Sequence, residues 1–250
     1  MKLIVIADIH ANLSALEAVL ADARRFDVDQ VVCLGDLVGY NAQPRQCLML
    51  IQMYADVVVA GNHDQNVCGT LEPLVGTNSV ALQAQIWTRA QLSDSELSYL
   101  AGLPNKHVQG DEYIAVHGCY LNEFHVNGYV TETMVPANLA AIAQHPDWPR
   151  LGFCGHTHIP LLAWLHGAGV VTANPQVGVD WPADAGAILL NPGSVGQPRD
   201  YDPRAAYAYV DTVERRAEVR RVAYDVDATV AAFRGTGLPP SVWERLYRGS

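Results

Sequence analysis

Short apolar runs alternate with amphipathic stretches along the first hundred or so residues. The run KLIVIAD, which ends at Asp8, is apolar and rich in β-branched residues, as is typical of a buried strand. Apolar residues then recur at helical spacing from Leu13 to Ala23, and Asn12 precedes them as a candidate N-cap. The pattern therefore predicts a strand followed by a helix at the start of the chain.

The same alternation recurs further along the chain. The runs QVVCLGD and DVVVAGNHD predict strands; a segment beginning near Pro44 follows the first, and a helix over residues 78–92 follows the second after a loop. Another helix is predicted from SDSE, where Ser93 and Glu96 have the spacing of a capping box. Repeated strand and helix units of this kind favour parallel strand pairing.

The second half of the sequence is richer in strands than in helices. The predicted strands are YIAVHG, LGFCGH, LLAWLHG, AILLNPGS, AAYAYVD and AEVRRVAY, with short helices near 134–144 and 226–234. Parallel units that lead into a strand-rich half predict an α/β sandwich of two mixed β-sheets flanked by helices. No composition shift or internal repeat divides the chain, so we expect a single domain over residues 1–250.

Composition narrows the class of protein. Half of the 250 residues are hydrophobic and 17% are charged, which indicates a globular protein. The formal net charge of -10 argues against an extended nucleic-acid surface, so any phosphate must be attracted by a local positive site. Five cysteines without a C-x-x-C pair favour buried thiols over a disulfide framework or a structural zinc site.

The start of the chain bears on localisation. The segment MKLIVIADIH reaches a carboxylate and a histidine too early for a signal peptide or a membrane span. We therefore expect a cytoplasmic protein without a membrane partner. The sequence does not decide whether the protein forms a homo-oligomer.

Polar side chains that can bind metal follow five of the predicted strands. They are Asp8, His10, Asp36, Asn62, His63, His117, His156 and His158. The carboxyl ends of strands are where open α/β sheets place their ligand sites. The D-x-H and H-x-H pairs have a spacing of two, which in an extended chain directs both side chains to the same side. Each pair is therefore expected to face one ion.

The donor set favours a centre of two metal ions. It combines carboxylate, amide and imidazole groups without a thiolate, which suits Mn, Fe, Ni, Zn or Mg better than a sulfur-rich zinc site. We expect Mn at this centre and keep Fe, Ni, Zn and Mg as alternatives. If Asp36 bridges, each of two ions receives four protein ligands from the set without His63. Two divalent cations beside two carboxylates leave the site at about +2, which attracts a phosphate ester.

Five motifs in order, DIH, GDLVG, GNHD, VHG and GHTH, resemble those of the calcineurin-like metallophosphoesterases. The chain is most similar to the small bacterial and archaeal phosphodiesterase and phosphatase branch, and the resemblance extends through IWTRAQL and NPGSVGQPRDYDP to about Asp211. It implies a four-layer αββα sandwich with a dinuclear metal centre. By position, one ion would be bound by Asp8, His10, Asp36 and His158, and the other by Asp36, Asn62, His117 and His156. The resemblance also implies attack on phosphorus by a metal-bridging hydroxide, with His63 as proton donor or transition-state stabiliser.

The sequence departs from part of the family after the second motif. Protein Ser/Thr phosphatases and related dinucleotide hydrolases usually carry Asp-Arg-Gly where this chain has Gly-Tyr-Asn at residues 39–41. The departure counts against that substrate class. It also removes the usual partner of His63, which leaves Asp64 as a candidate for orienting the imidazole.

Two roles are equally compatible with the sequence around Arg199. In the segment GQPRD it either reaches a substrate phosphate or pairs with Asp200 or Asp202, since arginine suits both uses. His125 is a further candidate for the rim of a substrate site.

Two classes of function fit these observations. The first is a metal-dependent phosphoesterase acting on phosphodiesters or phosphomonoesters of small molecules or nucleotides. The second is a non-catalytic metal-binding scaffold or binding protein that keeps the fold but not turnover. The second class predicts a loss of metal ligands or of His63, and the sequence retains them all.

Overall fold

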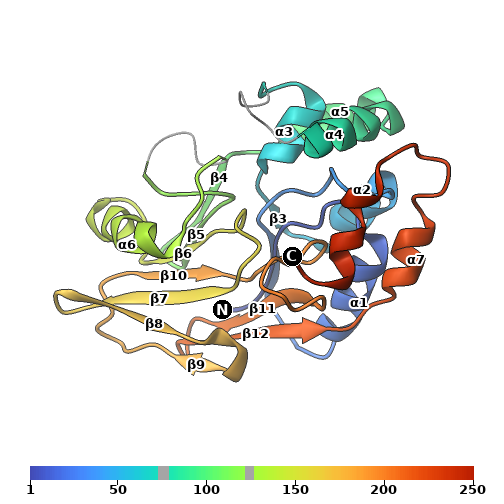
Figure 1. Ribbon diagram of the computed structural model, residues 1–250. Coiled ribbons are helices and arrows are strands. Elements are labelled where there is room, and N and C mark those ends of the chain that lie inside the picture. Colours follow the sequence, from blue (N-terminus) through green and yellow to red (C-terminus); the bar gives the residue numbers. More distant parts are fainter. Residues whose placement is uncertain (73–78, 122–126) are drawn as a thin grey trace.

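Two mixed β-sheets of six strands each, stacked face to face, form the centre of the molecule (Figure 1). The computed structural model describes residues 1–72, 79–121 and 127–250. The strands of the first sheet are, in spatial order, β3 (Val57–Val58), β2 (Gln30–Cys33), β1 (Lys2–Ile6), β11 (Ala205–Asp211), β12 (Arg216–Val222) and β9 (Val179–Asp180). Those of the second sheet are β4 (Lys106–Gln109), β5 (Tyr113–Val116), β6 (Leu151–Phe153), β10 (Ile188–Asn191), β7 (Leu161–His166) and β8 (Gly169–Ala173).

The parallel strands occupy one half of the first sheet and three adjacent inner positions of the second. Strands β1, β2 and β3 are parallel, as are β5, β6 and β10, while the other pairs are antiparallel. The carboxyl ends of β1, β2, β5 and β6 lead directly into the motifs that the sequence singles out. The turns after these strands therefore bring the candidate residues to one region between the sheets.

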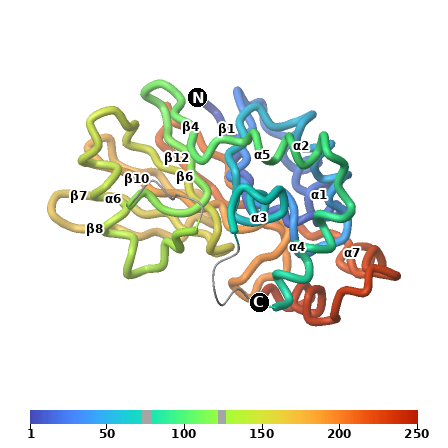
Figure 2. The backbone as a smooth tube through the Cα atoms, turned by 90° about the horizontal axis from the view of Figure 1, so that it is seen from above, coloured from blue at the N-terminus to red at the C-terminus, as the bar shows by residue number. Residues whose placement is uncertain are grey.

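Helices cover the outer faces of both sheets. The first sheet is covered by α1 (Leu13–Ala23) and α2 (Pro44–Tyr54), and the second by α6 (Val135–Gln144), so that α6 lies on the opposite side of the molecule from α1 (Figure 2). The remaining helices are α3 (Asn62–Cys68), α4 (Ser79–Gln91), α5 (Asp94–Ala101) and α7 (Val226–Ala231). Short 3-10 turns are η1 (Glu132–Met134), η2 (Pro175–Val177), η3 (Pro240–Val242) and η4 (Glu244–Tyr247). The four-layer αββα sandwich expected from the sequence is confirmed.

Alternation along β1 shows why the predicted strands are apolar throughout. Leu3 and Val5 pack between the two sheets, whereas Ile4 and Ile6 pack against the helices outside the first sheet. A strand buried on both faces has no polar side, so its sequence reads as a continuous apolar run. Within the described part of the chain, no helix is long and apolar enough to cross a membrane.

Most predicted elements lie where the sequence places them, and the caps are confirmed. The side chain of Asn12 accepts a hydrogen bond from the backbone N–H of Ala15 at 3.2 Å, and Ser93 and Glu96 cap α5 reciprocally. The helix predicted over residues 78–92 corresponds to α4, and its expected first residue, Asn78, lies outside the described residues.

The prediction that Asn62 and His63 end a strand is wrong. Strand β3 covers only Val57–Val58, and both residues belong to the first turn of α3. The Asp64 carboxylate accepts a hydrogen bond from the backbone N–H of Gly61 at 3.0 Å, which stabilises a helix start at this point. The short edge strands β4, β8 and β9 were not predicted, because they are largely exposed and lack a buried apolar face.

Candidate metal centre

The candidate residues from both sheets meet at one buried place. Those of the first sheet lie in turns after β1 and β2 and at the start of α3, and those of the second follow β5 and β6. All are buried except Asn62, which is half-buried. They are Asp8, His10, Asp36, Asn62, His63, His117, His156 and His158. The structure thus brings together residues that lie up to 150 positions apart in the sequence.

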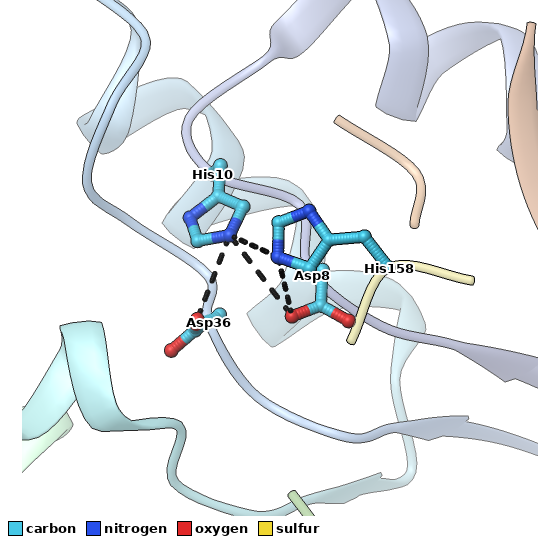
Figure 3. A group of neighbouring side chains, drawn as sticks. All are labelled: Asp8, His10, Asp36 and His158. Carbon is cyan, nitrogen blue, oxygen red and sulfur yellow. Dashed lines mark hydrogen bonds and ion pairs between the residues drawn. The ribbon is translucent and has the colours of Figure 1, made fainter. Parts of the chain in front are cut away.

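Four of these side chains form a first ligand group (Figure 3). The potential ligand atoms of Asp8, His10, Asp36 and His158 all lie within 4.8 Å of one another. His158 Nε2 is 3.3 Å from Asp8 Oδ1, and His10 Nε2 is 3.5 Å from Asp36 Oδ2. The two imidazoles face each other with their Nε2 atoms 3.1 Å apart. These are the four residues that the sequence analysis expects around the first ion, and the fold brings them together.

A second ligand group shares Asp36 with the first. The potential ligand atoms of Asp36, His117 and His156 lie within 4.8 Å of one another. His117 Nε2 is 3.4 Å from Asp36 Oδ2, 3.2 Å from His156 Nδ1 and 3.2 Å from Asn62 Oδ1. A single carboxylate oxygen, Asp36 Oδ2, is therefore close to a histidine of each group.

The outer nitrogens of three histidines show which ring atom faces the centre. Each Nδ1 lies within hydrogen-bond distance of a backbone carbonyl: His10 with Val38 (3.3 Å), His117 with Leu34 (2.7 Å) and His158 with Gln197 (2.5 Å). Because a carbonyl only accepts, Nδ1 carries the proton and the lone pair of a neutral ring lies on Nε2. When these rings are neutral, their three lone pairs point into the centre.

This geometry fits bound cations. Two Nε2 lone pairs 3.1 Å apart repel each other unless a positive charge lies near both. Asp8 Oδ1 is buried and has no hydrogen-bond partner among the described residues, which leaves an acceptor oxygen unsatisfied. Nitrogen and oxygen donors converging on one point are the chemistry that divalent transition ions select.

The backbone at the centre departs from the extended conformation that the i, i+2 spacing assumed. Asp8, His10, Asp36, His156 and His158 have φ values of 55°, 48°, 53°, 65° and 63°. This left-handed conformation costs on the order of 1–3 kcal/mol for each non-glycine residue and is concentrated at functional sites. Asp8 and His10 belong to one ligand group, as expected, but His156 and His158 belong to different groups, so the expectation that each pair faces one ion is wrong for the H-x-H pair. Tight left-handed turns, and not extended backbone, bring these side chains together.

Burial and the neighbouring charges shift the pKa values of the centre in opposite directions. Although burial raises it, His117 and His63 hold the pKa of Asp36 well below its usual range. Burial lowers the pKa of His117, but Asp36 outweighs it and raises the value to about 9. Burial and then His117 lower the pKa of His156 to about 3. The metal-free cluster therefore concentrates a proton on His117, and metal binding would have to displace it.

His63 is held by a glutamine that the sequence did not point to. Its Nδ1 lies 3.2 Å from Nε2 of the buried Gln85 in α4, and its ring centroid lies 4.7 Å from that of Tyr40. A side chain at residue 39 would not fit, because a Cβ built on Gly39 comes within 2.6 Å of His63 Nδ1. Gln85 belongs to none of the sequence motifs. The one signal that could have suggested it is a glutamine at a position of the predicted helix over residues 78–92 that faces the core.

The candidate role of Asp64 in orienting His63 is wrong. Its carboxylate accepts hydrogen bonds from the backbone N–H groups of Leu37 at 2.8 Å and Val38 at 3.2 Å, in addition to Gly61. These bonds tie the loop that carries Asp36 to the start of α3. Asp64 therefore fixes backbone and not the His63 ring.

Arg199 makes neither of the ion pairs proposed as its alternative role. Asp200 pairs with Arg221 and Asp202 with Arg204. Arg199 donates from Nη2 to Gln197 Oε1 at 2.8 Å, and its Nε is buried without a hydrogen-bond partner among the described residues. The backbone N–H of Arg199 lies 3.4 Å from the carbonyl oxygen of His158, so the residue lies beside the centre. Burial lowers the pKa values of His63 and His158, and the positive charge of Arg199 lowers them further. His125, the other candidate for the substrate rim, lies outside the described residues.

Comparisons with known proteins agree with this arrangement. A family model described as the calcineurin-like phosphoesterase superfamily domain matches residues 1–215. The chain is 34% identical over 248 residues to the uncharacterized protein MJ0912 of Methanocaldococcus jannaschii, with 98% of this chain and 97% of that protein covered.

Solved structures share the fold over the full length. The crystal structure of a metallophosphoesterase from Sphaerobacter thermophilus is 39% identical and has a TM-score of 0.84, covering 100% of this chain and 99% of that one. The hypothetical protein PH1004 from Pyrococcus horikoshii OT3, at 19% identity, has a TM-score of 0.80 and covers 100% and 98%. At that identity it shows the fold alone. The chain belongs to the calcineurin-like phosphoesterase superfamily and is a hydrolase that acts on phosphoric ester bonds.

Proposed function

We propose that the protein hydrolyses phosphodiesters or phosphomonoesters of small molecules or nucleotides at a centre of two divalent metal ions, manganese first among them. One ion would be held by Asp8, His10, Asp36 and His158, and the other by Asp36, Asn62, His117 and His156. The observation that carries the proposal is the shared carboxylate. Asp36 Oδ2 is 3.5 Å from His10 Nε2 and 3.4 Å from His117 Nε2, so one oxygen serves both ligand groups.

The protein's own groups have separate tasks around the bound phosphate. When bound, divalent ions lower the pKa of water and neutralise charge on the phosphoryl oxygens. Backbone carbonyls fix the rings of His10, His117 and His158 so that Nε2 faces inward. Arg199, which has no acidic partner among the described residues, is suited to a phosphate oxygen.

His63 is suited to the departing oxygen. The amide nitrogen of Gln85 can only donate, so His63 Nδ1 accepts and the proton of the neutral ring lies on Nε2. Burial lowers the pKa of His63 to about 4, which favours this neutral form at neutral pH. The ring then offers an N–H for proton donation or for stabilising charge.

A metal-depletion experiment tests the proposal. The full chain, stripped of metal with a chelator, should lose hydrolysis of nitrophenyl monoesters, nitrophenyl diesters and nucleotides alike. Single additions of Mn, Fe, Ni, Zn or Mg should restore activity, with Mn expected to be effective, because the ions supply the nucleophile and neutralise phosphate charge. Full activity in thoroughly metal-free protein, or no activity with any ion and ester, would contradict the proposal.

A further inference from the structure

A cavity of about 680 Å³ lies beside the candidate centre. Its walls come from residues 129–132, from the turn that begins between His156 and His158 and runs to β7, and from the end of β8. Cavities of several hundred Å³ are the size that holds a small molecule or a large substituent of one. The cavity shares no residue with the candidate ligand groups, so the metal centre does not account for it.

Two residues connect this cavity to the centre. Thr157, which lines the cavity, lies between the two candidate ligands of the H-x-H turn. Tyr129, which also lines it, stacks on the ring of His156 with centroids 4.0 Å apart and an interplanar angle of 26°. The edge of the His156 ring that carries Nδ1 faces His117, and this Nδ1 lies 3.2 Å from His117 Nε2. The His156 imidazole, itself a member of the second ligand group, therefore lies between Tyr129 of the cavity wall and His117.

The wall nearest the centre is held in place. The Thr157 hydroxyl accepts a hydrogen bond from Asn191 Nδ2 at 3.0 Å, and Asn191 Nδ2 also donates to the carbonyl of Gly155 at 2.7 Å. Asn191 ends β10 in the middle of the second sheet, which ties the turn to a rigid element. A wall fixed in this way can position a ligand without first being ordered.

The lining is mainly apolar and carries one negative charge. Ile159 is 47% exposed and Tyr129 is 50% exposed, although both are large side chains with apolar surface. Val130, Pro160 and Leu161 extend this surface, and Glu132 is the one carboxylate among the described lining residues, which include no lysine, arginine or histidine. Such a lining attracts an uncharged ring, because burying one removes apolar surface from water and stacks it on Tyr129. It disfavours a second anionic group, which Glu132 would repel.

We propose that this cavity binds an uncharged aromatic ring in the organic part of the phosphate ester while the phosphate lies at the metal centre. The inference rests on the proposed function, which it deepens by naming the preferred substrate class. It assigns Tyr129 and Ile159 as residues that determine specificity and leaves the reaction chemistry to the centre.

Two esters with similar leaving groups separate binding in the cavity from chemistry. In 2-phenylethyl phosphate and ethyl phosphate the departing alkoxides are chemically alike, and only the first carries an aromatic ring. The metal-loaded parent protein should hydrolyse 2-phenylethyl phosphate with a kcat/KM about 10- to 100-fold higher, as expected from burying one ring.

A matched pair of variants on β8 tests the location. Thr172 lines the cavity, whereas Val170 lies on the same face of the strand, is also exposed and does not line it. Thr172→Trp should fill the cavity and abolish most of the preference for the aromatic ester, while kcat/KM for ethyl phosphate stays within about twofold. Val170→Trp should leave both values unchanged. If Thr172→Trp does not fold, Ile159→Asn at an exposed wall position should likewise reduce the preference by several-fold.

The outcomes distinguish the inference from the function on which it rests. An unchanged preference in Thr172→Trp and Ile159→Asn, with ethyl phosphate still hydrolysed, would overturn the cavity assignment alone. Equal losses on both esters in each variant would also overturn it, because they would indicate damage to the centre. Failure of the metal-loaded parent protein to hydrolyse either alkyl monoester would overturn the inference, and the proposed phosphoesterase activity would fall with it only if nitrophenyl diesters and nucleotides were not hydrolysed either.

Discussion

His63 is the residue whose task is most open to a direct test. Its imidazole is buried beside Asp36, and its backbone N–H donates to Asp36 Oδ1 at 2.8 Å. Its ring nitrogens take no part in the two ligand groups. His63 thus lies close to the candidate metal ligands but is not one of them. This position suits a side chain that acts on the substrate.

Replacement of His63 by Asn should leave both metal ions bound and slow the reaction. If the ring donates a proton, the rate should fall by about 10²- to 10⁴-fold for an alkyl ester, whose alkoxide needs the proton. A nitrophenyl ester should lose less, because nitrophenolate is already a stable anion. Metal analysis and turnover of both esters check this. Equal losses on the two esters with full metal content would favour transition-state stabilisation, and loss of an ion would make His63 a ligand.

Gln85 should act through His63 and not independently. Gln85→Met removes the amide that bonds His63 Nδ1 but keeps a similar volume, so kcat should fall by about three- to tenfold, the equivalent of one hydrogen bond. In a His63→Asn background the same change should have no further effect. Gln83→Met, two residues earlier and exposed on the same helix, serves as the control. An unaltered effect in the double variant would mean that Gln85 only supports the fold.

At the scale of elements, helix α1 is attached to the first sheet by a polar contact as well as by its apolar face. Asp22 near the end of α1 accepts hydrogen bonds at 2.8 Å from Tyr207 of β11 and from Arg220 of β12. Hydrogen bonding by Arg220, which outweighs the opposing effect of burial, lowers the pKa of Asp22 to about 2. The carboxylate form is therefore bound more tightly in the folded state than in the unfolded chain.

Asp22→Asn should reduce the free energy of unfolding by about 1–2 kcal/mol at pH 7. Because the folded pKa is lower than the unfolded value near 3.8, this stabilisation is present above about pH 4 and is lost as the pH falls toward 2. Urea unfolding of parent and variant from pH 7 downward should show the difference shrinking over that acidic range. Asp27→Asn, at an exposed position nearby, is the control. A difference that does not change with pH would contradict the assignment.

At the scale of the whole molecule, the candidate centre joins the two sheets. Asp8, His10 and Asp36 follow strands of the first sheet, and His117 and His156 follow strands of the second. Both sheets also bury side chains in one shared core between them. We therefore propose that residues 1–250 form a single domain that unfolds as one cooperative unit.

Metal loading should raise the midpoint of thermal unfolding while keeping a single transition, because ligands on both sheets bind ions only in the folded state. Asp36→Asn should lower the occupancy of both ions together and abolish most of this rise, since Asp36 belongs to both groups. Asp111→Asn, at an exposed turn, should behave like the parent. Calorimetry with metal analysis measures both quantities. Full occupancy of both ions in Asp36→Asn would contradict the bridging role, and two separate transitions in the parent would contradict the single domain.

The sequence by itself determined the layered fold and most of the polar residues that meet at the centre. Buried strands read as apolar runs because both of their faces are covered, and chemistry placed directly after such strands collects at their carboxyl ends. Asp8, Asp36, His117 and His158 could therefore be selected from local position alone. Caps such as Asn12 were equally readable, because a cap bonds to a backbone group only three residues away.

Only the tertiary structure decided which distant side chains meet and how the backbone presents them. Gln85 reaches His63 across 22 residues, and Asp200, the acidic neighbour of Arg199 in the sequence, pairs with Arg221 instead. No periodic pattern of apolar and polar residues in the sequence indicates the left-handed turns at the centre or the cavity beside Tyr129. Periodicity reports which face of one element is buried, whereas these features depend on the packing of separate elements, which the spacing of residues along the chain does not encode.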